Sequence, residues 1–176
     1  GILADVRGSV AFSLAITEIA RGCASTAVTT SVTNMVAEVI QSVGNEQQKR
    51  TYLPKLCSGE FSAGAFCLTE VSAGSDPSSM RTTATKEGSD WILNGSKQFI
   101  TSGEYAGIFV VWAVTDKSLP KGKGISCFLV PRWRPDGSKN PLQVSRLKDK
   151  MGNASNATAE AELRGALGWM IGDEGR

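Results

Sequence analysis

The sequence contains no histidine among its 176 residues, and this absence removes several classes of enzyme at once. Ser-His-Asp and Cys-His catalytic arrangements need an imidazole, and most zinc sites need one too. We therefore expect no metal site. Any chemistry must come from a cofactor, from a carboxylate or from residues outside the chain.

A C-x-x-C pair is also absent, although the chain has four cysteines. Apolar neighbours flank Cys23, Cys57, Cys67 and Cys127. This setting is typical of buried free thiols, and it predicts neither disulfides nor thiolate metal ligands.

The sequence lacks a strong excess of charge. Nineteen basic and 17 acidic residues leave a net charge of +2, and so weak a field does not indicate binding to nucleic acid or to an anionic membrane. We find no signal peptide and no apolar run long enough to span a membrane, so we expect a cytoplasmic protein. The hydrophobic content of 41% is ample for a globular core.

Helical periodicity marks the first third of the chain. Apolar residues recur at intervals of three and four within residues 10–20 and again within 25–43. Asn45 and Gln48 form a capping pair for a short third helix, which Pro54 bends or ends. We therefore expect helices as far as about Ser62.

Beyond Ser62 the apolar period changes from 3.6 to 2, with turn residues between most of the runs. Many short strands without intervening helices favour an α+β fold, in which N-terminal helices (residues 1–62) precede an antiparallel β-barrel or sandwich (residues 63–176). The predicted strands are 63–68, 82–86, 91–94, 96–101, 108–115, 125–131, 142–146 and 158–163.

Two segments combine an apolar strand with hydroxyls and glycines at its end: FCLTEVSAGSD (66–76) and NGSKQFITSG (94–103). A flavin needs this mixture, because its ring requires a dry slot and its reduction places negative charge beside hydrogen-bond donors. Thr69 and Thr101 are our candidate donors. Gly74 and Ser75 suit a pyrophosphate, because glycine allows close approach and successive backbone N–H groups bind anions.

Each of these features also fits a simpler interpretation. Threonine is common in strands, so Thr69 and Thr101 taken singly are typical of ordinary strand residues. The sequence Gly74-Ser75-Asp76 is equally typical of a plain turn.

Together with GNEQQKRTYLPKL (44–56), the two segments resemble the signature segments of the acyl-CoA dehydrogenase flavoproteins, in the same order along the chain. The resemblance covers almost the whole chain but only the middle of a family member. It implies FAD as cofactor, α,β-dehydrogenation of an acyl-CoA thioester, an electron-transferring flavoprotein as acceptor and a homotetramer.

The resemblance also implies roles for individual residues. Phe99 occupies the position of an aromatic ring beside the flavin, usually Trp. The residues that would contact FAD are Phe66, Leu68, Thr69, Gly74, Ser75, Phe99, Ile100 and Thr101. Those that would contact the substrate are Ser75, Val28, Ser31 and Met35, although a Val/Met stripe on a helix is more often plain core.

No residue of this chain is expected to be catalytic. Glu70 follows Thr69, but the family's proton-abstracting base is a glutamate from a helical region after the β-domain. We expect that C-terminal helical domain to be absent here.

One loop departs from the common family pattern. Lys150-Met151-Gly152 is followed by NASNA, without the usual Arg and Asp. This version is similar to the branch that contains the DNA-associated adaptive-response flavoproteins. A DNA-associated flavoprotein with little dehydrogenase turnover is therefore the second hypothesis, and a mildly basic run is its further support: Arg132, Arg134, Lys139, Arg146, Lys148 and Lys150.

Overall fold

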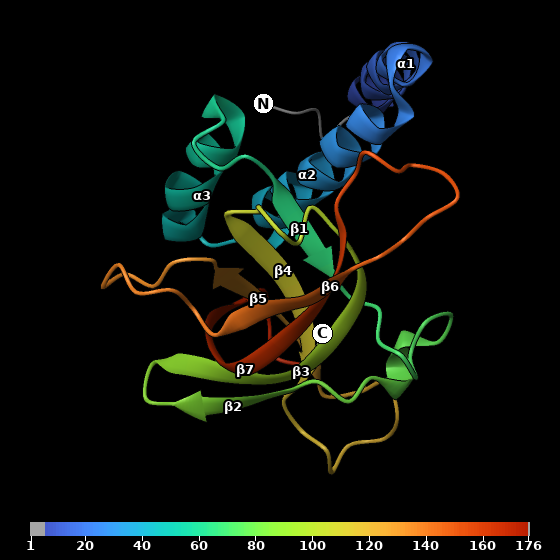
Figure 1. The fold of residues 1–176 in the computed structure, drawn as a ribbon. Coiled ribbons are helices and arrows are strands. Elements are labelled where there is room, and N and C mark those ends of the chain that lie inside the picture. Colours follow the sequence, from blue (N-terminus) through green and yellow to red (C-terminus); the bar gives the residue numbers. More distant parts are fainter. Residues whose placement is uncertain (1–5, 176) are drawn as a thin grey trace.

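The computed structural model describes residues 6–175, in which three helices precede a curved sheet (Figure 1). This arrangement confirms the predicted α+β class. The helices are α1 (Val6–Gly22), α2 (Ala24–Val43) and α3 (Glu46–Ser58), and a short 3-10 helix, η1 (Pro77–Ser79), follows the first strand. The strands are β1 (Gly64–Cys67), β2 (Thr83–Glu87), β3 (Asp90–Thr101), β4 (Ile108–Val114), β5 (Ile125–Pro131), β6 (Leu142–Leu147) and β7 (Thr158–Ile171).

The predicted capping pair begins α3. The Asn45 side chain accepts from the Gln48 N–H at 2.8 Å, and the Gln48 side chain accepts from the Asn45 N–H at 3.0 Å. Pro54 lies inside the helix without ending it, and the chain leaves the helix at Gly59 with φ of 81°. The Gln48 amide also donates to the Met170 carbonyl at 2.8 Å, so the same residue attaches α3 to β7.

The helix α2 packs directly on β1, which explains how a helix rich in Thr and Val is held. Val36 and Ile40 are fully buried in this contact. A Cβ atom on Gly64 would lie 2.8 Å from Cγ1 of Val36, so only glycine allows the strand to approach this closely.

The sheet departs from the predicted antiparallel barrel in two ways. β1 pairs with β4 in parallel, whereas β2–β3, β3–β7, β4–β5, β5–β7 and β6–β7 are antiparallel. β2 and β4 meet at a single pair, Thr83 and Val114. The sheet is therefore strongly curved but is not a closed barrel.

Two predicted strand ends are wrong for the same reason. Gly95 does not divide residues 91–101, because β3 continues through it with φ of 153° and a register shift at Leu93/Asn94. Likewise β7 passes Gly165 and Gly168 and reaches Ile171, because it pairs with β3, β5 and β6 along its length. Ladder pairing overrides the tendency of glycine to interrupt a strand.

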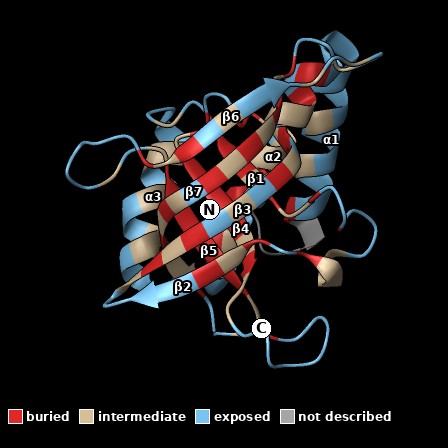
Figure 2. Ribbon diagram, turned by 60° about the horizontal axis from the view of Figure 1, so that its bottom comes forward, coloured by how far each residue is buried: buried red, intermediate tan, exposed pale blue. Residues whose placement is uncertain are grey.

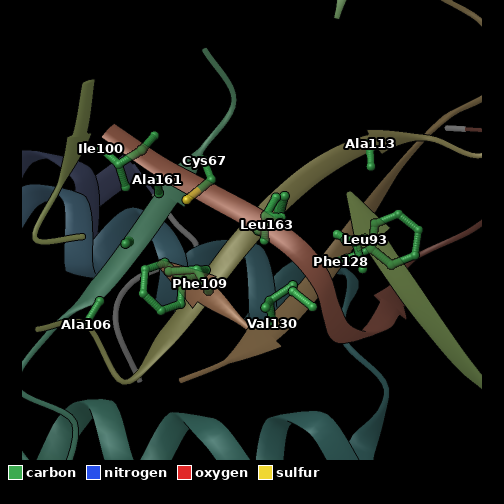
Figure 3. Close-up of a cluster of buried hydrophobic side chains, with 14 of the residues drawn as sticks. Cys67, Leu93, Ile100, Ala106, Phe109, Ala113, Phe128, Val130, Ala161 and Leu163 are labelled. Atoms are coloured by element: carbon green, nitrogen blue, oxygen red, sulfur yellow. The ribbon is translucent and has the colours of Figure 1, made fainter. Parts of the chain in front are cut away.

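Two apolar clusters fill the molecule, and Figure 2 shows buried residues along the strands of the sheet. One lies within the curve of the sheet and includes Leu93, Phe109 and Phe128, which Figure 3 shows together with neighbouring side chains of the cluster. The other lies between the sheet and the helices and includes Ile40 and Ile108. Adjacent residues of β4 enter different clusters, so both faces of this strand are buried.

The four cysteines differ in exposure. All are free thiols, but only Cys67 and Cys127 are buried as predicted. Cys23 lies in the break between α1 and α2, and Cys57 lies in the last turn of α3, where both are exposed. The prediction of burial is wrong for Cys57 because its apolar neighbours in the helix point in other directions, and for Cys23 because this residue lies outside both helices, at the N-cap of α2.

Among residues 6–175, no helix combines the length and apolar character needed to cross a membrane.

Candidate functional site

The two segments singled out in the sequence lie side by side. The Thr69 carbonyl accepts from the backbone N–H of Gln98 at 2.8 Å, and the Leu68 carbonyl accepts from Nζ of Lys97 at 3.1 Å. The chain beyond β1 is thus attached to the second half of β3. Thr69 and Thr101 are both half-buried, and Thr101 ends the same strand that contacts Thr69.

Phe99 is presented to solvent by an irregularity in β3. The register shifts between Lys97 and Ile100, and Phe99 adopts φ of 57°, which is uncommon for a bulky residue. Its side chain is 56% exposed, whereas Ile100 is 1% exposed. Phe99 therefore does not fill the core, and only the backbone of Ile100 can face a ligand.

A lysine covers the Phe99 ring. Nζ of Lys148 lies 4.5 Å from the ring centroid, within the range of a cation–π contact. The same ammonium donates to Glu160 at 3.0 Å. Sequence reasoning missed this contact, in which a lysine directly after β6 joins Glu160 of β7 to Phe99 of β3.

The glycine-rich turn after Thr69 is open to solvent. Glu70 and Ala73 exchange backbone hydrogen bonds of 3.2 and 3.1 Å, and Gly74 and Ser75 beyond them are exposed. A Cβ on Gly74 would meet nothing within 4 Å, so nothing within this chain requires glycine there. The space above Gly74 is free for a ligand to approach the backbone.

Asp76 fixes the far end of this turn. It accepts from the Ser78 N–H at 3.2 Å and pairs with Lys121 at 2.6 Å. The hydrogen bonds from Lys121 and Ser78 hold the pKa of Asp76 well below its ordinary value. Asp76 is therefore committed to anchoring the turn as a carboxylate.

Phe66 and Leu68 lie outside the apolar cluster within the curve of the sheet. Phe66 packs against Trp112, with ring centroids 4.4 Å apart. Leu68 and Trp112 line an open groove of about 490 Å³ beside η1, and Lys123 also lies on its wall. The structure thus places Phe66 against another aromatic ring and Leu68 at the edge of a groove.

The proposed acyl-contacting residues of α2 are only partly gathered. Met35 lines an open apolar groove of about 680 Å³ together with Val39 and Trp112. Val28 and Ser31 are half-buried on α2 but do not line this groove.

The loop that departs from the family pattern lies between β6 and β7 in the sequence and contacts both α2 and the end of β3. Asn156 is 3% exposed, and its amide donates to Oγ1 of Thr29 at 2.8 Å. The neighbouring Ala157 carbonyl accepts from the Ser102 N–H at 2.8 Å. The loop therefore lies between the Val28 region of α2 and the Thr101 end of β3.

A buried ion pair supports the site and was also missed. Nζ of Lys97 lies 2.8 Å from Oε1 of Glu70, with the two side chains 1% and 6% exposed. Glu70 further accepts from the backbone N–H groups of Arg81 at 2.6 Å and Thr82 at 3.0 Å. Lys97 stands among other polar residues in the predicted strand SKQFIT (96–101), so no sequence signal indicated this pair.

The charges of this pair are maintained by its hydrogen bonds. Burial by itself would raise the pKa of Glu70, but bonds from Lys97, Thr82 and Arg81 outweigh it and lower the pKa. Burial lowers the pKa of Lys97, and Glu70 opposes that shift.

The fold and the paired motifs define a class of protein, and comparisons with known proteins agree with it. The chain matches the family models "Acyl-CoA dehydrogenase, N-terminal domain" over residues 5–60 and "Acyl-CoA dehydrogenase, middle domain" over residues 65–166. The chain belongs to the acyl-CoA dehydrogenase family.

Individual relatives cover most of this chain but are much longer. The mitochondrial short-chain specific acyl-CoA dehydrogenase of Rattus norvegicus is 41% identical over 85% of this chain and 35% of its own length. The structure of butyryl-CoA dehydrogenase from Megasphaera elsdenii is 38% identical with a TM-score of 0.84, over 92% of this chain and 42% of that one. A glutaryl-CoA dehydrogenase from Mycobacterium smegmatis in complex with FADH2 is 36% identical with a TM-score of 0.76, over 88% and 37%. The chain thus spans about a third of the length of the curated relative.

Proposed function

We propose that this chain forms the flavin-facing part of an FAD-dependent acyl-CoA dehydrogenase. The observation that carries the proposal is the hydrogen bond from Gln98 to Thr69, which joins the two motif segments into one rim. An apolar rim with hydroxyls and an exposed aromatic ring is the surface that a flavin requires.

The residues present fit FAD on three counts. Thr69 and Thr101 are half-buried hydroxyls at the ends of adjacent segments. Phe99 stays 56% exposed although Lys148 lies over its ring. Gly74 leaves its backbone open to a phosphate, with no atom of the chain above it.

When bound, FAD supplies the two-electron acceptor for dehydrogenation of an acyl-CoA thioester. The hydroxyl of Thr69 and that of Thr101 would donate to the flavin edge where charge develops, and would hold its orientation. Phe99 and the backbone of Ile100 would exclude water from one face, with Phe66 and Leu68 extending the apolar wall. The exposed turn at Gly74 and Ser75 would hold the pyrophosphate through backbone N–H groups.

The remaining roles complete the proposal. Ser75 on the open turn and Val28, Ser31 and Met35 on α2 would contact acyl-CoA, with Met35 already on the wall of a groove. No residue of this chain is assigned as the base. We further propose an electron-transferring flavoprotein as electron acceptor, a homotetramer and a cytoplasmic location. The boundary between the helical part and the β-domain would fall between residues 62 and 63.

The DNA-associated alternative has less support, because much of the basic run is engaged within the chain. Arg132 donates to the carbonyls of Ala106 at 2.6 Å and Gly103 at 2.7 Å. Arg146 and Lys148 both pair with Glu160, at 2.7 and 3.0 Å. The donors of Arg132 are thus occupied by backbone carbonyls, and Glu160 offsets one of the two charges beside it, so the run offers fewer free cationic groups to phosphates.

The test uses the full-length protein that contains this chain. We expect it to bind FAD, turn yellow and bleach anaerobically with an acyl-CoA substrate. The double variant T69A/T101A should lose about tenfold or more in FAD affinity, since it removes two donors. T51A, on the exposed face of α3, is the matched control and should not change the affinity.

Two results would count against the proposal. One is a folded full-length protein that takes up no FAD. The other is bleaching that fails with every acyl-CoA while DNA binding weakens steeply with salt, which would favour the alternative.

A further inference from the structure

The buried Lys97–Glu70 pair and the neighbouring Gln98 hold the backbone on both sides of Thr69 and at Thr69 itself. Lys97 holds the carbonyl of the residue before Thr69 and the side chain of the residue after it. The next residue of β3, Gln98, holds the carbonyl of Thr69 itself. Thr69 is therefore fixed by contacts to the preceding residue, to the following residue and to its own backbone.

Stability alone does not account for this pair. Taking two charges out of water costs several kcal/mol per ion, and apolar residues of similar volume are often neutral or stabilising replacements. The pair is also nearly dry, in contrast to the Lys55–Glu60 pair, whose side chains are 37% and 58% exposed.

The position of the ammonium has an electrostatic consequence. Because Nζ of Lys97 donates to the Leu68 carbonyl, it polarises the peptide bond whose N–H belongs to Thr69. A polarised N–H is a stronger donor to an acceptor that gains negative charge. The carboxylate of Glu70 also accepts hydrogen bonds from the Arg81 and Thr82 N–H groups, which offset part of its negative charge. The Lys97 ammonium and the Glu70 carboxylate therefore do not act equally on the Thr69 peptide.

We propose that Lys97 and Glu70 are positioning residues of the flavin site, which fix Thr69 and make the site bind reduced FAD in preference to oxidised FAD. This inference rests on the function proposed above. Neither residue touches the reacting atoms. Their effect passes through the Leu68–Thr69 peptide.

The experiment measures the dissociation constant of oxidised FAD and the midpoint potential of the bound flavin in the full-length protein. Together they give the ratio of affinities for reduced and oxidised FAD. Lys97→Met leaves the carboxylate uncompensated and removes the charge-assisted hydrogen bond to the Leu68 carbonyl, and it should lower this ratio by about tenfold. Glu70→Gln leaves the ammonium uncompensated and should raise the ratio.

Opposite signs distinguish this role from simple support of the fold, because a merely structural role would weaken both forms alike in both variants. K55M, which breaks the exposed pair on α3, is the matched control and should leave the ratio unchanged. If a single variant fails to fold, the double variant K97M/E70Q removes both charges. It should lower the ratio by about threefold, because the polarising bond to Leu68 is lost.

The outcomes distinguish failure of the proposed function from failure of the role assigned to Lys97 and Glu70. A wild-type protein that binds no FAD overturns the proposed function and this inference with it. A wild-type protein that binds and is reduced, together with folded variants whose ratio is unchanged or moves in one direction, overturns the inference and leaves the proposed function standing.

Discussion

The contact between α2 and β1 can be tested by a single methyl group. In Gly64→Ala the new Cβ would lie 2.8 Å from Cγ1 and 2.9 Å from Cβ of Val36, closer than such atoms approach. Val36 is fully buried and β-branched, so it has few other rotamers within a helix. The backbone of α2 must therefore shift.

Overpacking of this kind costs about 1–3 kcal/mol. For a chain of this size the melting temperature should fall by roughly 2–12 °C. Thermal unfolding followed by circular dichroism measures this change. Gly74→Ala is the matched control, because its Cβ meets nothing within 4 Å and its melting temperature should hold or rise slightly.

A double-mutant cycle identifies the cause. In a Val36→Gly background both the Cβ and the γ-carbons that would clash are gone, so adding Gly64→Ala should cost much less than it does in the wild type. An unchanged melting temperature for G64A, or equal costs in the two backgrounds, would refute the reasoning about this contact.

Three further variants test other parts of the site. Phe99→Ala should weaken FAD binding by about tenfold, by analogy with other aromatic stacking contacts, with little change in melting temperature because the ring is 56% exposed; fluorescence titration measures this, and a large loss of stability would contradict it. Asn156→Ala should cost about 1–3 kcal/mol in urea unfolding, because the buried Thr29 contact is lost; an unchanged midpoint would contradict the role of this loop. The pKa of Glu70 is lowered in the folded protein, so the stability that this carboxylate contributes is complete above its unfolded pKa of about 4.3 and is lost as the pH falls through its folded pKa. Glu70→Gln should therefore lose less unfolding free energy than the wild type between pH 6 and pH 3, as measured by urea unfolding at each pH. An equal loss of unfolding free energy in the two proteins would contradict this.

Local chemistry determined much of the architecture. The capping pair Asn45 and Gln48, and the stop at Gly59, follow from rules that act within a few residues, and the structure has both. The change from helical to strand periodicity near Ser62 is of the same kind, because burial of one face imposes the period of the element.

Tertiary contacts decided the strand bounds, the direction of strand pairing and the exposure of two cysteines. β3 and β7 run through glycines because partner strands supply the hydrogen bonds, and β1 pairs in parallel with β4, which follows it in the chain only after β2 and β3. Cys57 is exposed because the direction of its side chain depends on which face of α3 packs, and Cys23 is exposed in the break between α1 and α2.

The candidate site shows the same division. The two motif segments, with Thr69 and Thr101, could be found from residue types alone, since hydroxyls after an apolar run are visible in the sequence. That Gln98 bonds Thr69, that Lys97 reaches Glu70 inside the protein and that Lys148 covers Phe99 required the folded chain. Such pairs join residues far apart in sequence, and the sheet register that brings them together is set by the packing of the whole domain.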